Sequence, residues 1–219
     1  MKNKEEKLLV SFVVPLYNTR EYIEACILSV LNSSLDKNKY EVIVINDGST
    51  DGGEKIVESL IKQHANVYLI NKENGGQSTA RNIGLSKAKG KYIFFLDSDD
   101  QIISKNLNKV LLYADANNLD MFPIDMIYVT EEGETHSKNR KDYLPVFEEP
   151  ISGAVFMNKF TVEGTMWRYL YKNSIIKENK LKMIEGVYHE DEDFVMRYLL
   201  HVKRIAYKKQ LLYKQTDRK

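Results

Sequence analysis

Short apolar runs and amphipathic stripes alternate along the first 120 residues of the chain. Four runs rich in branched and aromatic residues are typical of strands buried on both faces. They are Leu8–Leu16, Glu41–Asn46, Val67–Asn71 and Tyr92–Leu96. Apolar positions at helical spacing follow each run and predict helices over residues 19–31, 53–64, 78–88 and 104–117. Repeated strand–helix units predict an α/β fold in which helices cover both faces of a mostly parallel sheet.

The pattern changes after Leu119. An extended arm is predicted over Met121–Val129, and a returning strand over Tyr143–Val146. The charged segment between them, residues 131–142, lacks periodicity and predicts a solvated loop. A last helix is predicted over Glu190–His201, whereas the polar end of the chain carries no predicted element. With no clear linker, the pattern predicts a single domain over residues 1–219.

The composition narrows the classes of function. Lys and Arg number 32 against 31 Asp and Glu, and a general nucleic-acid binder usually carries a basic excess, so no nucleic-acid partner is expected. No apolar run approaches the roughly 20 residues of a membrane-spanning helix. The only cysteine, Cys26, lies on the apolar stripe of the first predicted helix, and we expect it to be a core residue. A single cysteine also fits a reducing compartment.

Polar, turn-forming residues follow each of the four predicted strands. Ligands of open parallel sheets bind beyond the carboxyl ends of the strands, so these edges form the candidate site. No GxGxxG follows the first strand and no GxxxxGK[ST] occurs, which disfavours a dinucleotide fold and a P-loop. Asp97-Ser98-Asp99 follows the fourth strand, and two carboxylates so spaced can share Mg²⁺ or Mn²⁺. An acidic turn is the alternative interpretation of such a triplet.

Two further residues point to the same edge of the sheet. With Ser78 as N-cap, Arg81 falls in the first turn of its helix, where a guanidinium and backbone N–H groups suit a phosphate. A solvent-facing arginine is the alternative. Asp51 is the expected N-cap of the helix that begins near Gly53, which leaves Asp47 free to bind a ligand.

Five short motifs occur in order along nearly the whole chain. They are SFVVPLYN (11–18), NDGSTD (46–51), NGGQSTARNIGL (74–85), FLDSDD (95–100) and HEDEDF (189–194). Each motif is weak alone, but together they resemble the family 2 glycosyltransferases of GT-A fold. The resemblance implies sugar transfer with inversion from a nucleotide-sugar donor, often UDP-linked, to a hydroxyl acceptor. It also implies a divalent cation, Mn²⁺ or Mg²⁺.

The resemblance assigns the donor to the first half of the chain, residues 1–118. Asp99 matches the family's metal-binding acid, and Asp47 matches the acid that reads the base. The remaining donor-side residues are Pro15, Tyr17 and Asn18 beside the nucleoside, Arg81 near the diphosphate, and Asp97 with Ser98 at the acid motif.

The resemblance assigns the acceptor, a saccharide or lipid-linked molecule, to the second half, residues 119–219. Asp191 matches the general base and is preferred to Asp193, which belongs to a second Glu-Asp pair in the same motif. Trp167 and Glu190 match residues on the acceptor side. Many relatives continue past the point where this chain stops, so a catalytic domain truncated at its C-terminus is expected.

Some features depart from the family pattern or leave alternatives open. Arg168 and Tyr169 stand where a lysine often follows the tryptophan, and no QxxRW motif of polymerising synthases occurs. A catalytically impaired nucleotide-sugar-binding domain is one alternative. A nucleotidyltransferase is another, although the first strand lacks the Gly-rich basic loop that would hold a triphosphate. By analogy alone, the expected setting is polysaccharide or lipid-linked oligosaccharide synthesis in the cytoplasm, with peripheral association at the inner membrane face.

Overall fold

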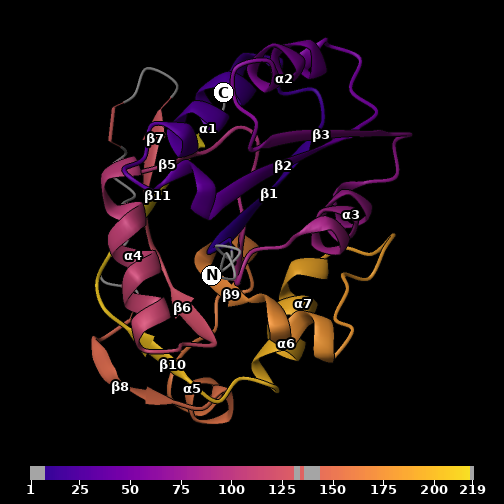
Figure 1. The fold of residues 1–219 in the computed structure, drawn as a ribbon. Coiled ribbons are helices and arrows are strands. Elements are labelled where there is room, and N and C mark those ends of the chain that lie inside the picture. Colours follow the sequence, from indigo (N-terminus) through magenta and orange to yellow (C-terminus); the bar gives the residue numbers. More distant parts are fainter. Residues whose placement is uncertain (1–7, 131–133, 136–143, 218–219) are drawn as a thin grey trace, which may run out of the picture.

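The computed structural model describes residues 8–130, 134–135 and 144–217. The first half alternates strands and helices, as the apolar pattern predicts (Figure 1). Its elements are β1 (Val10–Leu16), α1 (Arg20–Leu31), β2 (Tyr40–Asp47), α2 (Gly53–Ile61), β3 (Val67–Lys72), α3 (Gln77–Lys87), β4 (Tyr92–Phe95), β5 (Gln101–Ile102) and α4 (Ser104–Ala116). A single 3₁₀ turn, Lys37–Lys39, precedes β2.

The second half contains shorter elements, and several join the sheet of the first half. They are β6 (Met121–Pro123), β7 (Asp125–Thr130), β8 (Phe147–Ile151), α5 (Gly153–Lys159), a 3₁₀ turn (Met166–Arg168), β9 (Tyr169–Lys172), α6 (Asn173–Glu178), α7 (Glu190–Leu199), β10 (Ile205–Tyr207) and β11 (Leu211–Asp217).

Eight strands form the central sheet in the order β3-β2-β1-β4-β9-β6-β10-β8. Strands β1 to β4 are mutually parallel, whereas β9 runs antiparallel to both of its neighbours, β4 and β6. Strand β10 is parallel to β6, and the edge strand β8 is antiparallel to β10. The sheet is therefore mostly parallel and carries helices on its faces, which confirms the predicted α/β class.

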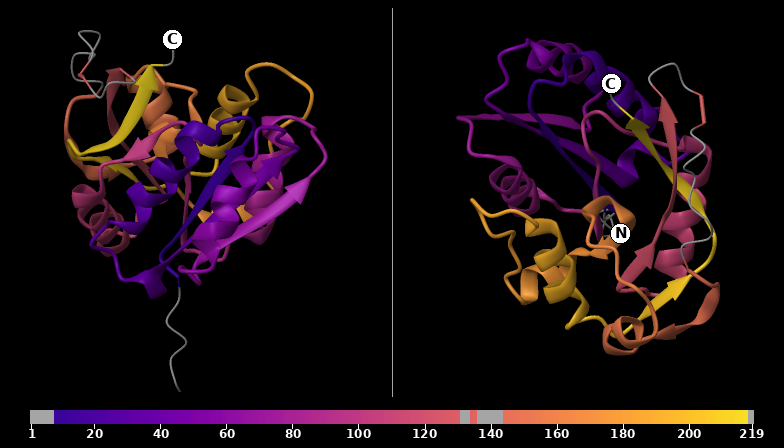
Figure 2. Two further views of the ribbon diagram at one scale, coloured as in Figure 1. Left: turned by 90° about the horizontal axis from the view of Figure 1, so that it is seen from above. Right: turned by 180° about the vertical axis from the view of Figure 1, so that it is seen from behind.

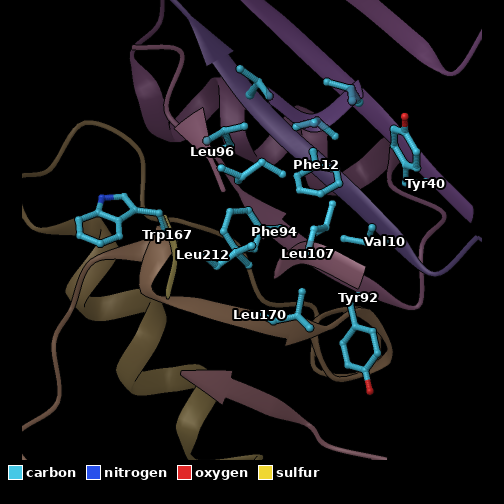
Figure 3. Packing of buried hydrophobic residues seen from close by; sticks show 14 of the residues in the cluster. Val10, Phe12, Tyr40, Tyr92, Phe94, Leu96, Leu107, Trp167, Leu170 and Leu212 are labelled. Carbon is cyan, nitrogen blue, oxygen red and sulfur yellow. The ribbon is translucent and has the colours of Figure 1, made fainter. Parts of the chain in front are cut away.

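Neighbouring residues of β1 point to opposite faces of the sheet, as the two-residue period of a strand requires. Phe12 belongs to one apolar core, which includes residues of α1, α2 and α4, whereas Val13 belongs to a second core with residues of α3, α5, α6 and α7. Figure 3 shows Phe12 and Phe94 together in the first core, with ring centroids 5.7 Å apart. Cys26 is fully buried in this core, which confirms its prediction as a core residue.

A second sheet of three strands, β5-β11-β7, lies against the first core. In the rear view of Figure 2, the yellow strand β11 runs alongside β7, with which it pairs in parallel. The apolar pattern does not predict β11, because only Leu212 and Tyr213 are buried in an otherwise polar segment.

The return strand predicted over Tyr143–Val146 is wrong for its described part, and Tyr143 itself lies outside the described residues. Residues 144–146 form no strand, and the next strand, β8, begins at Phe147 and pairs with β10 in the large sheet. The arm predicted over Met121–Val129 is extended, as β6 and β7. Of the segment predicted as a solvated loop, only Glu134 and Thr135 lie within the described residues.

Candidate active site

A cavity of about 530 Å³ opens at the carboxyl ends of β1, β2 and β4, where the topology predicts a site. Its sequence-predicted lining residues are Pro15, Tyr17, Asp47, Asp97, Ser98 and Asp99. The cavity is also lined by Leu16, Thr19, Asn74, Gly76, Gln77, Asp100, Gln215 and Thr216. The first group and most of the second come from the first half of the chain, whereas Gln215 and Thr216 come from β11.

The loop after β1 presents one aromatic side chain to the cavity. Tyr17 is 51% exposed, so its side chain is available to a ligand in the cavity. Asn18 does not line the cavity and instead connects two loops. Its Oδ1 accepts a hydrogen bond from the Thr50 N–H at 2.9 Å, and its own N–H donates to the Ser49 hydroxyl at 3.2 Å.

The prediction that Asp47 is free is wrong. Its carboxylate contacts the Lys72 ammonium and accepts hydrogen bonds from the N–H groups of Gly75 and Gly76, at 2.9 and 2.8 Å. Asp47 therefore fixes the loop that leads into α3 while its side chain still borders the cavity. The side chain of Asp51 accepts from the N–H of Gly53 at 2.9 Å, as expected of a cap, but Gly52 occupies the N-cap position itself.

The N-cap of helix α3 lies two residues earlier than the sequence predicts. Gly76, not Ser78, is its N-cap, with a φ of 90° that favours glycine. Ser78 is buried inside the first turn. The Gly76 end of the helix faces the cavity, together with Asn74 and Gln77.

The acid loop, Asp97–Asp100, follows β4 directly. Asp97 and Asp99 are partly exposed and line the cavity. Ser98 is buried, and its hydroxyl lies 2.7 Å from that of Thr19 in a hydrogen bond. The loop thus presents carboxylate oxygens to the cavity while Ser98 ties it to the loop after β1.

Asp100 is a cavity residue that the sequence motifs do not assign to a role. Its carboxylate accepts hydrogen bonds from the Tyr213 hydroxyl at 2.6 Å and from the Thr216 N–H at 2.8 Å. Burial and the neighbouring Asp97 charge raise the pKa of Asp100 to about 8, against the two hydrogen bonds, which lower it. The only sequence signal for this contact is the position of Asp100 as the last acid of FLDSDD.

Arg81 is buried behind the cavity rather than exposed within it. Its side chain is 4% exposed, and its Nη2 donates to Asp97 Oδ1 at 2.7 Å. Its Nη1 lies 3.8 Å from Glu190 Oε1 in α7. When the side-chain oxygen of Gln77 is turned toward the guanidinium, it accepts a hydrogen bond from Arg81 Nη1 at 2.8 Å. One guanidinium therefore joins the acid loop to the first turn of α7.

This contact brings together two acidic motifs that lie far apart in the sequence. Asp191 follows Glu190 in the first turn of α7, and its carboxylate accepts from the Glu192 N–H at 3.0 Å. Asp193 instead contacts Arg197 one turn later, with 2.9 Å between Oδ2 and Nε. Asp191 does not border the 530 Å³ cavity itself.

Trp167 lies in the apolar interior rather than on an open wall. Its ring stacks on Tyr213, with centroids 4.6 Å apart and planes 13° apart, and it is 7% exposed. Figure 3 shows its indole at the margin of the first core. Arg168 is buried beside it and contacts Glu163 at 3.1 Å.

The acid loop suits a hard cation in its chemistry. Mg²⁺ usually binds proteins through one or two carboxylates and takes its remaining ligands from water and substrate phosphates. The carboxylates of Asp97 and Asp99 at the cavity match that requirement. Within the described residues, no group of three or more His, Cys, Asp or Glu side chains is arranged to hold a metal by itself.

A mostly parallel sheet with a polar cavity at its carboxyl edge, an acid loop after β4 and a second acidic turn at α7 define a GT-A-type glycosyltransferase fold. The sequence profile of "Glycosyl transferase family 2" matches residues 11–180. The chain belongs to this family.

Similar proteins are named as glycosyltransferases. The chain is 36% identical over 202 residues to an uncharacterized glycosyltransferase of Haemophilus influenzae, covering 90% of this chain and 74% of that protein. It is 29% identical to the uncharacterized glycosyltransferase YibD of Escherichia coli, covering 98% of this chain and 62% of YibD. The chain thus spans about six-tenths of the length of YibD.

One solved structure is similar over nearly the whole chain. TarS of S. aureus, residues 1–349 in complex with UDP, superposes with a TM-score of 0.81 and 26% identity, covering 96% of this chain and 61% of that one. A complex of the same TarS fragment with UDP-GlcNAc superposes with the same TM-score. Within the described residues of this chain, no helix has the length and apolarity needed to cross a bilayer.

Proposed function

We propose that this chain transfers a sugar from a nucleoside diphosphate donor to a hydroxyl acceptor, with inversion at the anomeric carbon. The observation that carries the proposal is the contact of Arg81 with both Asp97 and Glu190, which sets the acid loop against the turn that bears Asp191. Membership of glycosyl transferase family 2 and the UDP and UDP-GlcNAc complexes of TarS support a nucleotide-sugar donor, UDP-linked in the simplest case.

The cavity residues take separate roles in binding the donor. Pro15 and the exposed ring of Tyr17 flank the nucleoside, and Asp47, fixed by the loop before α3, faces the base. Asp97 and Ser98 hold the acid loop in place, so that Asp99 can bind Mn²⁺ or Mg²⁺. Such a cation, when bound, neutralises charge on the departing diphosphate.

Asp191 acts as the general base. Its carboxylate takes the proton of the acceptor hydroxyl as that oxygen attacks the anomeric carbon. The bond from this carbon to the diphosphate oxygen breaks, and the nucleoside diphosphate leaves with the electron pair. A single displacement from the opposite face inverts the configuration. Asp193 is less suited to this role, because Arg197 already holds its carboxylate.

A thermal-shift panel of UDP-, GDP- and dTDP-sugars with Mn²⁺ or Mg²⁺ tests donor binding. A donor at 100 times its Kd should stabilise the fold by about 2.7 kcal/mol. The metal alone and free monosaccharides serve as controls. If no nucleotide or nucleotide sugar raises the melting temperature, the proposed function is wrong.

Asp191→Asn tests the assignment of the base. We expect turnover to fall about 10²–10⁴-fold, because a typical general base contributes that much, while donor affinity stays unchanged. Asp193→Asn is the matched control and should keep turnover within a few-fold of the parent. The reverse result would assign the base to Asp193. Donor binding without turnover in the parent chain would favour a catalytically impaired binding domain.

The setting follows from the relatives and is equally a proposal. TarS carries the name of a poly(ribitol-phosphate) β-N-acetylglucosaminyltransferase, and the chain is 28% identical to it over 198 residues. We therefore place the reaction in the synthesis of a surface polysaccharide or lipid-linked oligosaccharide, with a cytoplasmic donor and peripheral association at the membrane.

A further inference from the structure

The segment between α6 and α7, residues 182–189, shows large apolar side chains to solvent. Tyr188 is 95% exposed, and Ile184 and Val187 are each 47% exposed. Single exposed apolar residues are ordinary on a protein surface, but a group of them on one short segment marks an interaction site.

The segment is held firmly at its base. Asn82 of α3 accepts from the Met183 N–H at 2.8 Å and donates to the Met183 carbonyl at 3.0 Å. Its amide also donates to the carboxylate of Glu185 at 3.0 Å, and Arg197 of α7 donates to the Lys182 carbonyl at 2.7 Å. Hydrogen bonds to α3 and α7 therefore fix the backbone that carries the exposed side chains of the segment.

Tyr188 has no role in starting α7. It occupies the position before the N-cap, His189, where an apolar residue often packs against the fourth residue of the helix. In α7 that fourth residue is Asp193, whose carboxylate contacts Arg197. With no apolar partner there, the ring of Tyr188 points into solvent.

The segment lies beside the second acidic motif of the site. Tyr188 is three residues from Asp191, so their Cα atoms are at most about 11 Å apart. Trp167, the aromatic expected on the acceptor side, is buried against Tyr213 and cannot present its face to a ligand. Tyr188 is thus the exposed aromatic nearest in sequence to the proposed base.

We propose that Tyr188, together with Ile184 and Val187 of the same segment, forms the acceptor subsite and stacks on an uncharged pyranose ring. A tyrosine combines an apolar ring face with a hydroxyl at its edge, and a pyranose combines a face of C–H bonds with a rim of hydroxyls. The inference rests on the proposed transfer function, since it names the acceptor of that reaction.

The charge of the surrounding residues indicates which class of ligand suits this apolar surface. Residues 182–193 contain five carboxylates, at Glu185 and Glu190–Asp193, and a single lysine, Lys182. Arg81 faces Glu190 and Arg197 faces Asp193, so the carboxylates of Glu185, Asp191 and Glu192 remain in excess over Lys182. This remaining negative charge repels a polyphosphate chain and an anionic lipid surface, both of which seek basic patches. An uncharged saccharide carries no such penalty.

Saturation-transfer NMR tests the subsite on the whole chain loaded with UDP and Mg²⁺. The probes are the methyl glycosides of glucose, galactose and N-acetylglucosamine. We expect saturation transfer to the ring C–H protons of at least one glycoside in the parent. Tyr188→Ala should weaken that binding at least about tenfold, and Tyr188→Phe, which keeps the ring, should stay within threefold. Tyr68→Ala is the control, because Tyr68 is an exposed tyrosine on β3.

Calorimetry with UDP and Mg²⁺ is run on every variant and should show Kd values within twofold of the parent. If the parent chain does not bind UDP, the proposed function is contradicted. The saturation-transfer signals of the glycosides test the acceptor subsite separately. The inference is overturned if the parent binds none of the glycosides or if Tyr188→Ala binds them as well as the parent. It is also overturned if Tyr188→Ala instead loses binding to ribitol 5-phosphate or to phosphatidylglycerol vesicles.

Discussion

Arg81 contacts acidic side chains from two separate segments of the site. Its guanidinium offers five N–H donors in a rigid fork, and it uses them on carboxylates from two segments, Asp97 and Glu190. Because the side chain is buried and does not line the cavity, we interpret it as a positioning residue rather than a ligand of the diphosphate.

Arg81→Gln should therefore lower turnover more than donor affinity. A hydrogen bond to a charged group contributes about 1.5–3 kcal/mol, so losing the link predicts a fall in turnover of about 10- to 100-fold. We expect the Kd of UDP with Mn²⁺ to change by less than about threefold. Steady-state kinetics with the donor that the thermal-shift panel selects, and calorimetry with UDP, measure the two effects.

Two companion variants make this prediction specific. Arg81→Lys keeps the charge but cannot hold both carboxylates, so its turnover should also fall. Lys91→Gln removes a partly exposed ion pair, in which Lys91 Nζ lies 2.5 Å from Asp115 Oδ1. Lys91 precedes β4, whereas the acid loop follows it, so this variant should leave turnover unchanged. A loss of UDP affinity of 100-fold in a folded Arg81→Gln chain would place the guanidinium on the diphosphate instead.

Among the elements, strand β11 links the two halves at the site. It pairs with β5, directly after the acid loop, and with β7, and it supplies Gln215 and Thr216 to the cavity. Tyr213 anchors it, since its hydroxyl donates to the buried Asp100 and its ring stacks on Trp167. The strand therefore holds the end of the acid loop at Asp100, whereas Arg81 holds its start at Asp97.

Tyr213→Phe tests this anchor, because it removes the hydroxyl and keeps the ring. Leaving a buried polar group without its partner costs about 1–3 kcal/mol, and we expect that loss in the free energy of unfolding. Urea titration followed by circular dichroism measures it. Tyr68→Phe, on the exposed side of β3, should change the value by less than about 0.5 kcal/mol. An equal effect of the two substitutions would mean that the anchor contributes nothing.

How far the sequence predicts each element depends on how that element is buried. Strands β1, β2 and β4 are buried on both faces, so continuous apolar runs mark them. Strand β11 is half polar and pairs with strands far away in the chain, so no local pattern identifies it. The same limit applies to β8, whose segment Phe147–Ile151 contains two adjacent glutamates and a proline.

In the candidate site, too, the sequence predicts residues that belong to a local motif but not the distant residues that contact them. Acids that follow buried strands, such as Asp97 and Asp99, are visible as motifs, and the structure places them at one cavity. Their partners are not visible, because Lys72 reaches Asp47 across 25 residues and Tyr213 reaches Asp100 across 113. Spacing along the chain cannot specify such contacts, so the sequence predicts a free Asp47 and assigns no role to Asp100.

At the scale of the whole molecule, the two halves share one sheet. Strand β9, from the second half, lies between β4 and β6 and pairs with both. Phe95 of β4 packs against Tyr171 of β9 and Phe194 of α7, with ring centroids 5.6 and 6.1 Å apart. Separating the halves would expose these rings and the edge of β4, so neither half has a complete core of its own.

The chain should therefore unfold as one cooperative unit, and it carries one probe in each half. Cys26 is the only cysteine and Trp167 the only tryptophan. Burial raises the pKa of the Cys26 thiol well above its usual value, so the thiol stays protonated and unreactive until the first half opens. The fluorescence of Trp167, stacked on Tyr213, reports on the second half and on β11.

In a urea titration at equilibrium, reaction of Cys26 with Ellman's reagent in brief pulses and the emission of Trp167 should give the same midpoint. Coincident transitions from separate probes are the signature of two-state unfolding. Cys26→Ser, followed by fluorescence alone, controls for any effect of the label on Trp167. If Cys26 becomes reactive at a urea concentration where Trp167 is still native, the first half opens on its own. The shared sheet would then join two independent units, and the donor side and the acceptor side of the site would not be held in fixed register by the fold.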